Sequence, residues 1–133
     1  MSFCQGSKYP IADTYRRKGD TVMTKVIFEE IGQRYFFEVS GHAVTGEDVE
    51  AIGEGEAVCA ALSILILSAA SRISEMDSRG DLISSHVSVE SGYACFDIEP
   101  RDDVIYAVKE MFDILLTGIT LLEENFPALV CIE

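Results

Sequence analysis

Cys59 and His42 are the two residues of this sequence whose types could carry out covalent chemistry together. If a helix begins near Gly55, the Cys59 thiol lies in its first turn, where unpaired backbone N–H groups and the helix dipole favour a thiolate. The thiolate is the form that attacks a carbonyl carbon, and an imidazole is its usual base. Helical spacing also places Glu56 and Ser63 on the same face as Cys59. This pattern is typical of a nucleophilic cysteine, although free cysteine is also a common core residue.

The sequence offers two candidates for the base. His42 follows a predicted strand and comes directly after Gly41, where a loop begins, so it is either the partner of the thiol or a loop histidine without a role. His86 alternates with Ser84 and Ser88 along a second predicted strand. Because alternate residues of a strand share one face, His86 is expected to be a solvated histidine on a polar surface.

Other catalytic and ligand-binding motifs are missing. The sequence has no Gly-rich phosphate loop, no HExxH and no GxSxG, and one histidine beside one cysteine is too small a set for zinc. We therefore expect neither a metal nor a cofactor. The four cysteines include no CxxC pair and are too few for a disulfide scaffold, which favours a reduced, cytoplasmic protein.

No targeting or membrane segment is expected. The first twenty residues lack the apolar stretch of a signal peptide. The most apolar segment, Ala57–Ala70, has 14 residues, whereas a membrane span needs about 20.

The chain is strongly acidic, with 23 Asp and Glu residues, 10 Lys and Arg residues and a net charge of −13. This balance argues against a general nucleic-acid binder, which needs a basic face, and favours a basic partner. The charge is uneven, because residues 35–71 contain six acids and no Lys or Arg. That window holds both His42 and Cys59. It is interpreted either as a field that steers a basic peptide or as a solvated acidic loop.

Length and composition indicate one domain with one core, because 48% of the 133 residues are hydrophobic. Residues 1–22 lack periodicity and are expected to form a flexible N-terminal extension, or else a basic tail that touches the acidic body. Residues 23–133 form the domain.

The expected elements alternate between hairpins and helices. Ala57–Met76 is apolar on all sides, which predicts a helix buried all round against a sheet, another helix or a second subunit. Two hairpins are expected, Thr24–Glu29 with Arg34–Ser40 and Leu82–Glu90 with Tyr93–Glu99. A short helix is possible at 47–52, and a last strand is expected at Ala128–Ile132. An amphipathic helix is expected to start at Asp102 and Asp103 and to be closed by Asn125 and Pro127, with its apolar stripe over 104–122. The order β-β-α-β-β-α-β predicts an α+β fold, a mainly antiparallel sheet with two helices.

Two segments together resemble the ribosomal-processing cysteine protease family, Prp. They are Phe37–Ala43 (FEVSGHA) and Val58–Ser63 (VCAALS), and the similarity extends to the ENFPALV segment near the C-terminus, so that it covers residues 24–133. Three features depart from the family's pattern. Glu56 stands where the family usually has Asp, the loop between the two segments is several residues longer, and the residues before Met23 are extra.

The resemblance implies a small bacterial cysteine endopeptidase, a thiol protease of the cytoplasm that is typically a homodimer. Such hydrolases remove a short N-terminal extension from large-subunit ribosomal protein L twenty-seven during ribosome biogenesis. It implies that Cys59 is the nucleophile and His42 the base, with Gly41, Glu56 and Ser63 at supporting positions. The substrate would be a basic ribosomal-protein N-terminal peptide, with no direct nucleic-acid or membrane binding. The loop after His42 would cover the cleft.

Two other functions compete with this expectation. The chain could be a non-catalytic, ribosome-associated dimeric binding protein that keeps the fold and the cysteine. A redox-sensing thiol is the third hypothesis, but no second cysteine lies near Cys59 in sequence to resolve a sulfenic acid.

Overall fold

The computed structural model describes residues 23–41 and 49–133, apart from the side chains of residues 49–54. The predicted extension, residues 1–22, and His42 lie outside the described residues. The elements are β1 (Thr24–Ile31), β2 (Arg34–Ser40), α2 (Val49–Ser78), β3 (Leu82–Glu90), β4 (Tyr93–Pro100), the short 3-10 helix η2 (Asp102–Val104), α3 (Ile105–Asn125) and β5 (Val130–Ile132).

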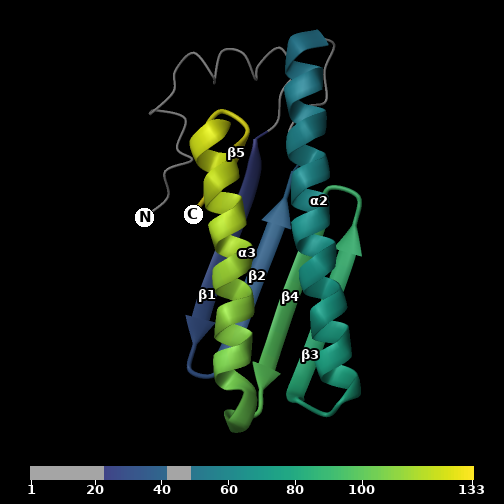
Figure 1. Cartoon of the computed structure of the whole chain (residues 1–133), viewed down its shortest axis with the longest axis vertical. Coiled ribbons are helices and arrows are strands. Elements are labelled where there is room, and N and C mark those ends of the chain that lie inside the picture. Colours follow the sequence, from purple (N-terminus) through teal and green to yellow (C-terminus); the bar gives the residue numbers. More distant parts are fainter. Residues whose placement is uncertain (1–22, 42–48) are drawn as a thin grey trace.

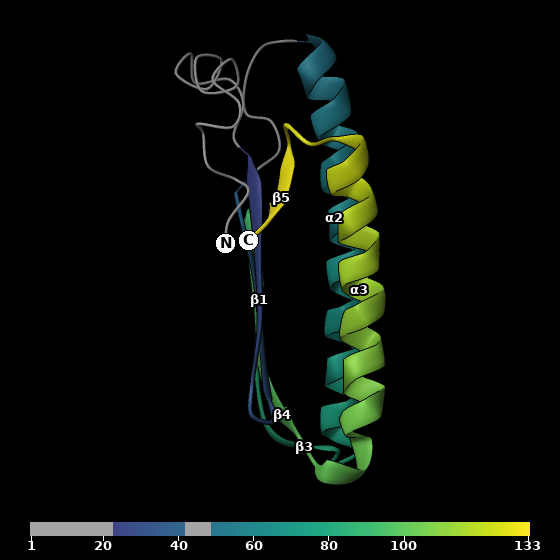
Figure 2. The same cartoon turned by 90° about the vertical axis from the view of Figure 1, so that its left-hand side faces the viewer.

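The strands form one five-stranded sheet in the order β3-β4-β2-β1-β5. All neighbouring pairs are antiparallel except β1 and β5, which run parallel. Both long helices lie on the same face of the sheet (Figures 1 and 2). The fold is therefore the expected α+β arrangement, and the predicted order β-β-α-β-β-α-β is confirmed.

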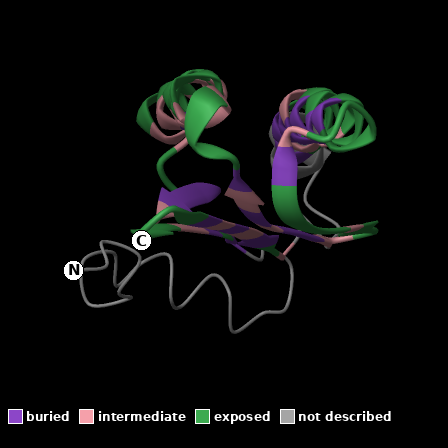
Figure 3. Cartoon of the chain, turned by 90° about the horizontal axis from the view of Figure 1, so that it is seen from below, coloured by how far each residue is buried: buried purple, intermediate pink, exposed green. Residues whose placement is uncertain are grey.

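The core lies between the sheet and the helices, and it follows from strand alternation. In β2, Tyr35, Phe37 and Val39 are buried, whereas the residues between them are less buried. Alternate side chains point to opposite faces, so this row faces the helices. Tyr35 stacks on Phe112 of α3 with ring centroids 5.6 Å apart, and Phe37 stacks on Phe96 of β4 at 5.4 Å. Figure 3 shows the buried residues where the two layers meet, and exposed ones on the outer sides of the helices.

Helix α2 is longer than the sequence predicted. It runs without a break from Val49 to Ser78, so the expected short helix at 47–52 and the helix expected over Ala57–Met76 are one element. Gly53 and Gly55, which suggested a boundary, lie inside it. A glycine costs a helix interior about 1 kcal/mol relative to alanine, which weakens the helix without having to end it.

Burial of α2 is also less complete than predicted. One stripe, which includes Val58, Leu62 and Ile73, is buried, but Ile64 and Leu67 are 66% and 50% exposed. The expectation of burial on all sides is therefore wrong for the single chain. By length and composition alone, Gly55–Ser78 could cross a membrane, with a mean hydropathy of 1.8. One such helix is weak support for a span, because the core helix of a soluble protein passes the same test.

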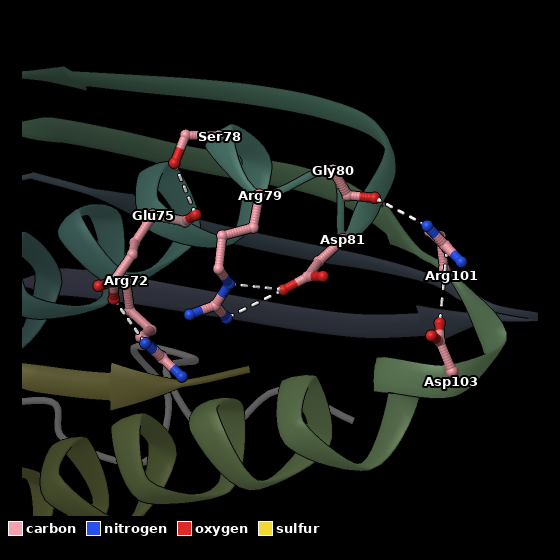
Figure 4. A network of polar contacts seen from close by, with 8 residues as sticks. All are labelled: Arg72, Glu75, Ser78, Arg79, Gly80, Asp81, Arg101 and Asp103. Carbon is pink, nitrogen blue, oxygen red and sulfur yellow. Dashed lines mark hydrogen bonds and ion pairs between the residues drawn. The ribbon is translucent and has the colours of Figure 1, made fainter.

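The end of α2 is joined to the rest of the fold by polar contacts (Figure 4). Arg79 forms an ion pair with Asp81, and Arg101 contacts both the Gly80 carbonyl oxygen and Asp103. The Arg101 backbone N–H also donates to the Asp81 carbonyl oxygen at 2.9 Å. These contacts hold the start of β3 to the end of β4, at the opposite end of this hairpin from its 90–93 turn.

Candidate active site

Cys59 lies on α2 in the wall of a cavity of about 320 Å³. The cavity is bordered by α2, by the ends of β1 and β2 and by the turn between β3 and β4. Cys59 itself is only partly buried and packs against the hydrophobic core. A half-buried thiol beside a cavity can meet a ligand, which a fully buried core cysteine cannot.

Most of the cavity wall is apolar. It is formed by side chains from α2 and from three strands: Val39, Leu62, Ile66, Leu67, Val89 and Ala94. Such a wall excludes water and receives apolar groups, while a few polar groups set their orientation.

The polar part of the wall contains Ser63, one helical turn after Cys59. The expectation that these two residues share a face is therefore confirmed. Glu56, the third residue predicted on that face, is exposed and is not among the residues that line the cavity. Its carboxylate faces solvent and does not meet a ligand in the cavity directly.

Gly41, directly after β2, also lines the cavity. Its φ is +101°, a left-handed conformation that L side chains rarely adopt. Its N–H donates to the Gly92 carbonyl oxygen at 2.9 Å, which joins the end of β2 to the β3–β4 turn. His42 is the next residue of the chain.

Of the two candidate bases, only His86 can be placed. It is exposed and pairs with Asp97 in the register between β3 and β4. Ser84 and Ser88 are the alternate residues on either side of His86 in β3, so all three lie on the face of the sheet that points away from the helices. The prediction of a solvated histidine on a polar face is confirmed, and His86 is not among the residues that line the cavity.

One argument for a reactive Cys59 is wrong. Cys59 was expected in the first turn of its helix, but α2 begins at Val49, about three turns earlier. Backbone N–H groups inside a helix bond to carbonyl oxygens of the preceding turn, so those near Cys59 are not available to hold a thiolate or an oxyanion. The helix terminus therefore does not supply the activation that the sequence led us to expect for this thiol.

The rim of the cavity is acidic. Glu90 is the one charged side chain among the described residues that line it. On the sheet face that points away from the helices, where Cys95 also lies, the Tyr93 hydroxyl donates a 2.8 Å hydrogen bond to Glu38 Oε2 and joins β4 to β2. That hydrogen bond, followed by burial, raises the pKa of Tyr93 above its usual value. Tyr93 therefore stays a neutral donor over the physiological pH range.

Thr24 borders the same cavity and was not singled out from the sequence. It is 1% exposed, and its Oγ1 is the one buried side-chain N or O atom without a hydrogen-bond partner among the described residues. A buried hydroxyl without a partner is costly and is uncommon in folded proteins. No pattern in the sequence could have marked it, because Thr24 meets the cavity only through the pairing of β1 with β2.

Cys95 provides an internal contrast to Cys59. It lies on β4 between Ala94 and Phe96, which face the helices, so its own side chain lies on the other face of the sheet. It is 7% exposed. Burial raises the pKa of its thiol, and the carboxylates of Glu38 and Asp97 add to the effect. It is a structural cysteine.

The described residues contain no group of three His, Cys, Asp or Glu side chains placed to hold a metal ion. Besides apolar residues, the residues that line the cavity include one cysteine, one glutamate and four residues with a hydroxyl group: Cys59, Glu90, Thr24, Ser63, Ser91 and Tyr93. Such a set suits hydrogen bonding and nucleophilic attack.

The fold resembles that of a solved protein. The crystal structure of SMU.848 from Streptococcus mutans aligns with 84% of this chain and 96% of its own, with a TM-score of 0.57 and 26% sequence identity. No family model matches the chain, and no curated protein does so either. The similarity supports the fold, and the name SMU.848 specifies no activity.

Proposed function

We propose that the chain is a cytoplasmic cysteine endopeptidase that removes an N-terminal extension from large-subunit ribosomal protein L twenty-seven during ribosome biogenesis. One observation carries the proposal. Cys59 of α2 and Gly41 at the end of β2 line the same cavity, and Gly41 is directly followed by His42 in the sequence. A thiol, a cavity and a histidine that follows a cavity residue in the sequence are the parts from which thiol proteolysis can be built.

In the proposed reaction, the Cys59 thiolate attacks the scissile carbonyl carbon and forms a thioester as the C–N bond breaks. His42, protonated by the thiol, gives its proton to the leaving amine. Water then hydrolyses the thioester and restores the thiol. Because the backbone N–H groups of α2 are already bonded, the Ser63 hydroxyl serves as the donor to the oxyanion from the cavity wall.

The substrate follows from the charge and the cavity wall. A basic peptide is attracted to the acidic chain and to Glu90 at the rim, while the apolar wall accepts an apolar side chain. A second copy would cover Ile64 of α2, which is 66% exposed, in keeping with a homodimer.

The test is cleavage of a synthetic peptide that carries the N-terminus of the same organism's ribosomal protein L twenty-seven. We expect cleavage by the wild type and by Cys95→Ala, and none by Cys59→Ala. Cys95 is a suitable control because it is also a free cysteine but lies on the face of the sheet that α2 and Cys59 do not cover. Unchanged cleavage by Cys59→Ala would contradict the proposal.

The second candidate is a non-catalytic, ribosome-associated dimeric binding protein. It is favoured by the position of Cys59 about three turns inside α2, where the helix terminus does not activate the thiol. This candidate predicts that the peptide binds to the wild type and remains intact.

A further inference from the structure

β3 is an edge strand without the usual protection of such strands. In the described part of the chain it pairs only with β4, and it forms one margin of the sheet (Figure 1). Edge strands leave a row of N–H and C=O groups open to another chain, and proteins commonly block them with Lys, Pro, bulges or short length. From Ser84 to Glu90, β3 has no Lys and no Pro, and its one irregularity lies before this stretch, between Leu82 and Ser84.

The opposite margin of the sheet differs. β5 is three residues long, from Val130 to Ile132, and this brevity limits the pairing it can offer to another chain. β5 pairs only with Thr24–Val26 of β1, so residues 27–31 of β1 also have no strand partner on that side among the described residues. The β3 edge is the longer of the two open edges, and its end borders the Cys59 cavity.

The side chains beside the open edge are apolar on the helix-facing side. Val87 and Val89 pair with Phe96 and Ala94 of β4, which face the helices, and they are 39% and 42% exposed. Leu67 of α2, which is 50% exposed, lines the same cavity as Val89. An apolar row thus runs along the edge of β3 and ends in the cavity.

The direction of β3 connects this edge to the thiol. The strand ends at Glu90, and both Val89 and Glu90 border the cavity that contains Cys59. A segment that pairs with the free edge of β3 therefore leaves the sheet beside the cavity.

Charge indicates what kind of segment this edge accepts. Residues 82–100, the β3–β4 hairpin, contain Glu90, Asp97 and Glu99 and no Lys or Arg. Because Glu90 stands where the edge meets the cavity, a basic segment is attracted there and an acidic one is repelled.

We propose that the peptide substrate binds as an additional strand on the free edge of β3, with alternate apolar side chains against Val87, Val89 and Leu67. Its backbone hydrogen bonds to β3 provide affinity, and the apolar row selects peptides with an apolar residue at every second position. The strand then delivers the scissile bond to Cys59. This inference rests on the proposed function.

The first experiment measures binding apart from cleavage. Full-length Cys59→Ala protein is titrated with the L twenty-seven N-terminal peptide, followed by fluorescence anisotropy, and each peptide N–H is methylated in turn. Only every second N–H of an added strand points at its partner. We therefore expect the dissociation constant to rise about tenfold at alternate positions and little between them. A dissociation constant that changes equally at all methylated positions, a flat profile, would overturn the inference.

The second experiment changes the edge. Val87→Lys places a charge on the helix-facing side of β3, a device by which natural edges prevent strand addition. We expect it to raise the dissociation constant of the peptide more than tenfold. Ile83→Lys is the matched control, because Ile83 is 62% exposed on the same strand and lies at the irregularity between Leu82 and Ser84, outside the regular Ser84–Glu90 stretch. Thermal melting of both variants verifies folding.

The outcomes separate this inference from the proposed function. An alternating profile together with loss of binding in Val87→Lys supports the inference, even if the wild type leaves the peptide intact and the protease proposal fails. Cleavage by the wild type with a flat profile and unchanged binding by Val87→Lys overturns the inference alone. If no binding and no cleavage occur, both fail. If Val87→Lys converts a dimer into a monomer and leaves peptide binding unchanged, the edge pairs with a second copy and the inference is wrong.

Discussion

Gly41 lies directly against the backbone of Met23. A Cβ at position 41 would meet the Met23 carbonyl oxygen at 2.8 Å, closer than real Cβ contacts come. Met23, the first residue of the domain, and Gly41, the residue before His42, are thus packed so closely that position 41 has no room for a side chain. This contact fixes where β2 ends and the chain departs beside the Cys59 cavity.

Gly41→Ala is expected to lower the free energy of unfolding and to abolish peptide cleavage. The left-handed backbone alone costs an L residue roughly 1–2 kcal/mol, and the contact with Met23 adds to that cost. Gly32→Ala is the matched control, since Gly32 also has a positive φ, +61°, but nothing lies within 4 Å of its added Cβ. Urea unfolding followed by circular dichroism measures both. Equal losses for the two variants would show that the Met23 contact has no effect.

Cys59 is expected to react with iodoacetamide faster than Cys95 in the native protein at pH 7.5. Cys95 is 7% exposed and its pKa is raised by burial, so little of its thiol is accessible or ionised. Raising the pH should increase the rate at Cys95, and urea should remove most of the difference. Peptide mapping by mass spectrometry gives the two rates. Faster labelling of Cys95 in the native state would contradict the assignment of Cys59 as the accessible thiol.

The local sequence pattern was sufficient to predict the strands but not to predict the surroundings of Cys59. The alternation of Tyr35, Phe37 and Val39 predicts which face of β2 is buried, because burial of a strand repeats every second residue. The start of α2 could not be predicted in the same way. The low helix propensity of Gly53 and Gly55 suggests that a helix starts after them. Each glycine, however, costs the helix only about 1 kcal/mol, which the rest of a 30-residue helix can outweigh.

The composition of the cavity depends on strand order, which is a non-local property. β4 pairs with β2, and this pairing brings the 90–93 turn next to Gly41. Nothing in the sequence near Cys59 specifies Thr24 or Val89 as its neighbours. The sequence could therefore nominate the thiol, Ser63 and Gly41, but not the walls around them.

Thr24→Val is expected to stabilise the protein. The change removes a buried hydroxyl that has no hydrogen-bond partner within the part of the chain that the structure describes, and it keeps the branched shape of the side chain. Burying such a hydroxyl costs about 1–3 kcal/mol in proteins, so the free energy of unfolding should rise by about 1 kcal/mol or more. Thr24→Ser, which keeps the hydroxyl and loses a methyl group, should be less stable than the wild type. Urea unfolding distinguishes the two, and a destabilised Thr24→Val would mean that the hydroxyl has a partner in solution.

Tyr35→Phe is expected to make the protein less sensitive to alkaline pH. Burial, followed by the nearby Glu30 carboxylate, raises the pKa of Tyr35 to about 12, whereas a phenol in the unfolded chain titrates near 10. The folded state therefore holds the Tyr35 proton more tightly, and this part of the stability is present below pH 10 and is lost as the pH rises from about 10 to 12.

The measurement for Tyr35 is the urea midpoint at pH 8, 10, 11 and 12. The wild type should lose stability over the last three points more steeply than Tyr35→Phe does. Tyr35→Phe should still lose some stability as the pH rises, because the pKa of Tyr93 is also raised in the folded protein. Tyr106→Phe is the matched control. Because Tyr106 is 81% exposed, this substitution should leave the dependence of stability on pH unchanged. If Tyr35→Phe and Tyr106→Phe lose stability in parallel with the wild type, the Tyr35 phenol is not protected by the core, and its stacking on Phe112 does not exclude solvent at high pH.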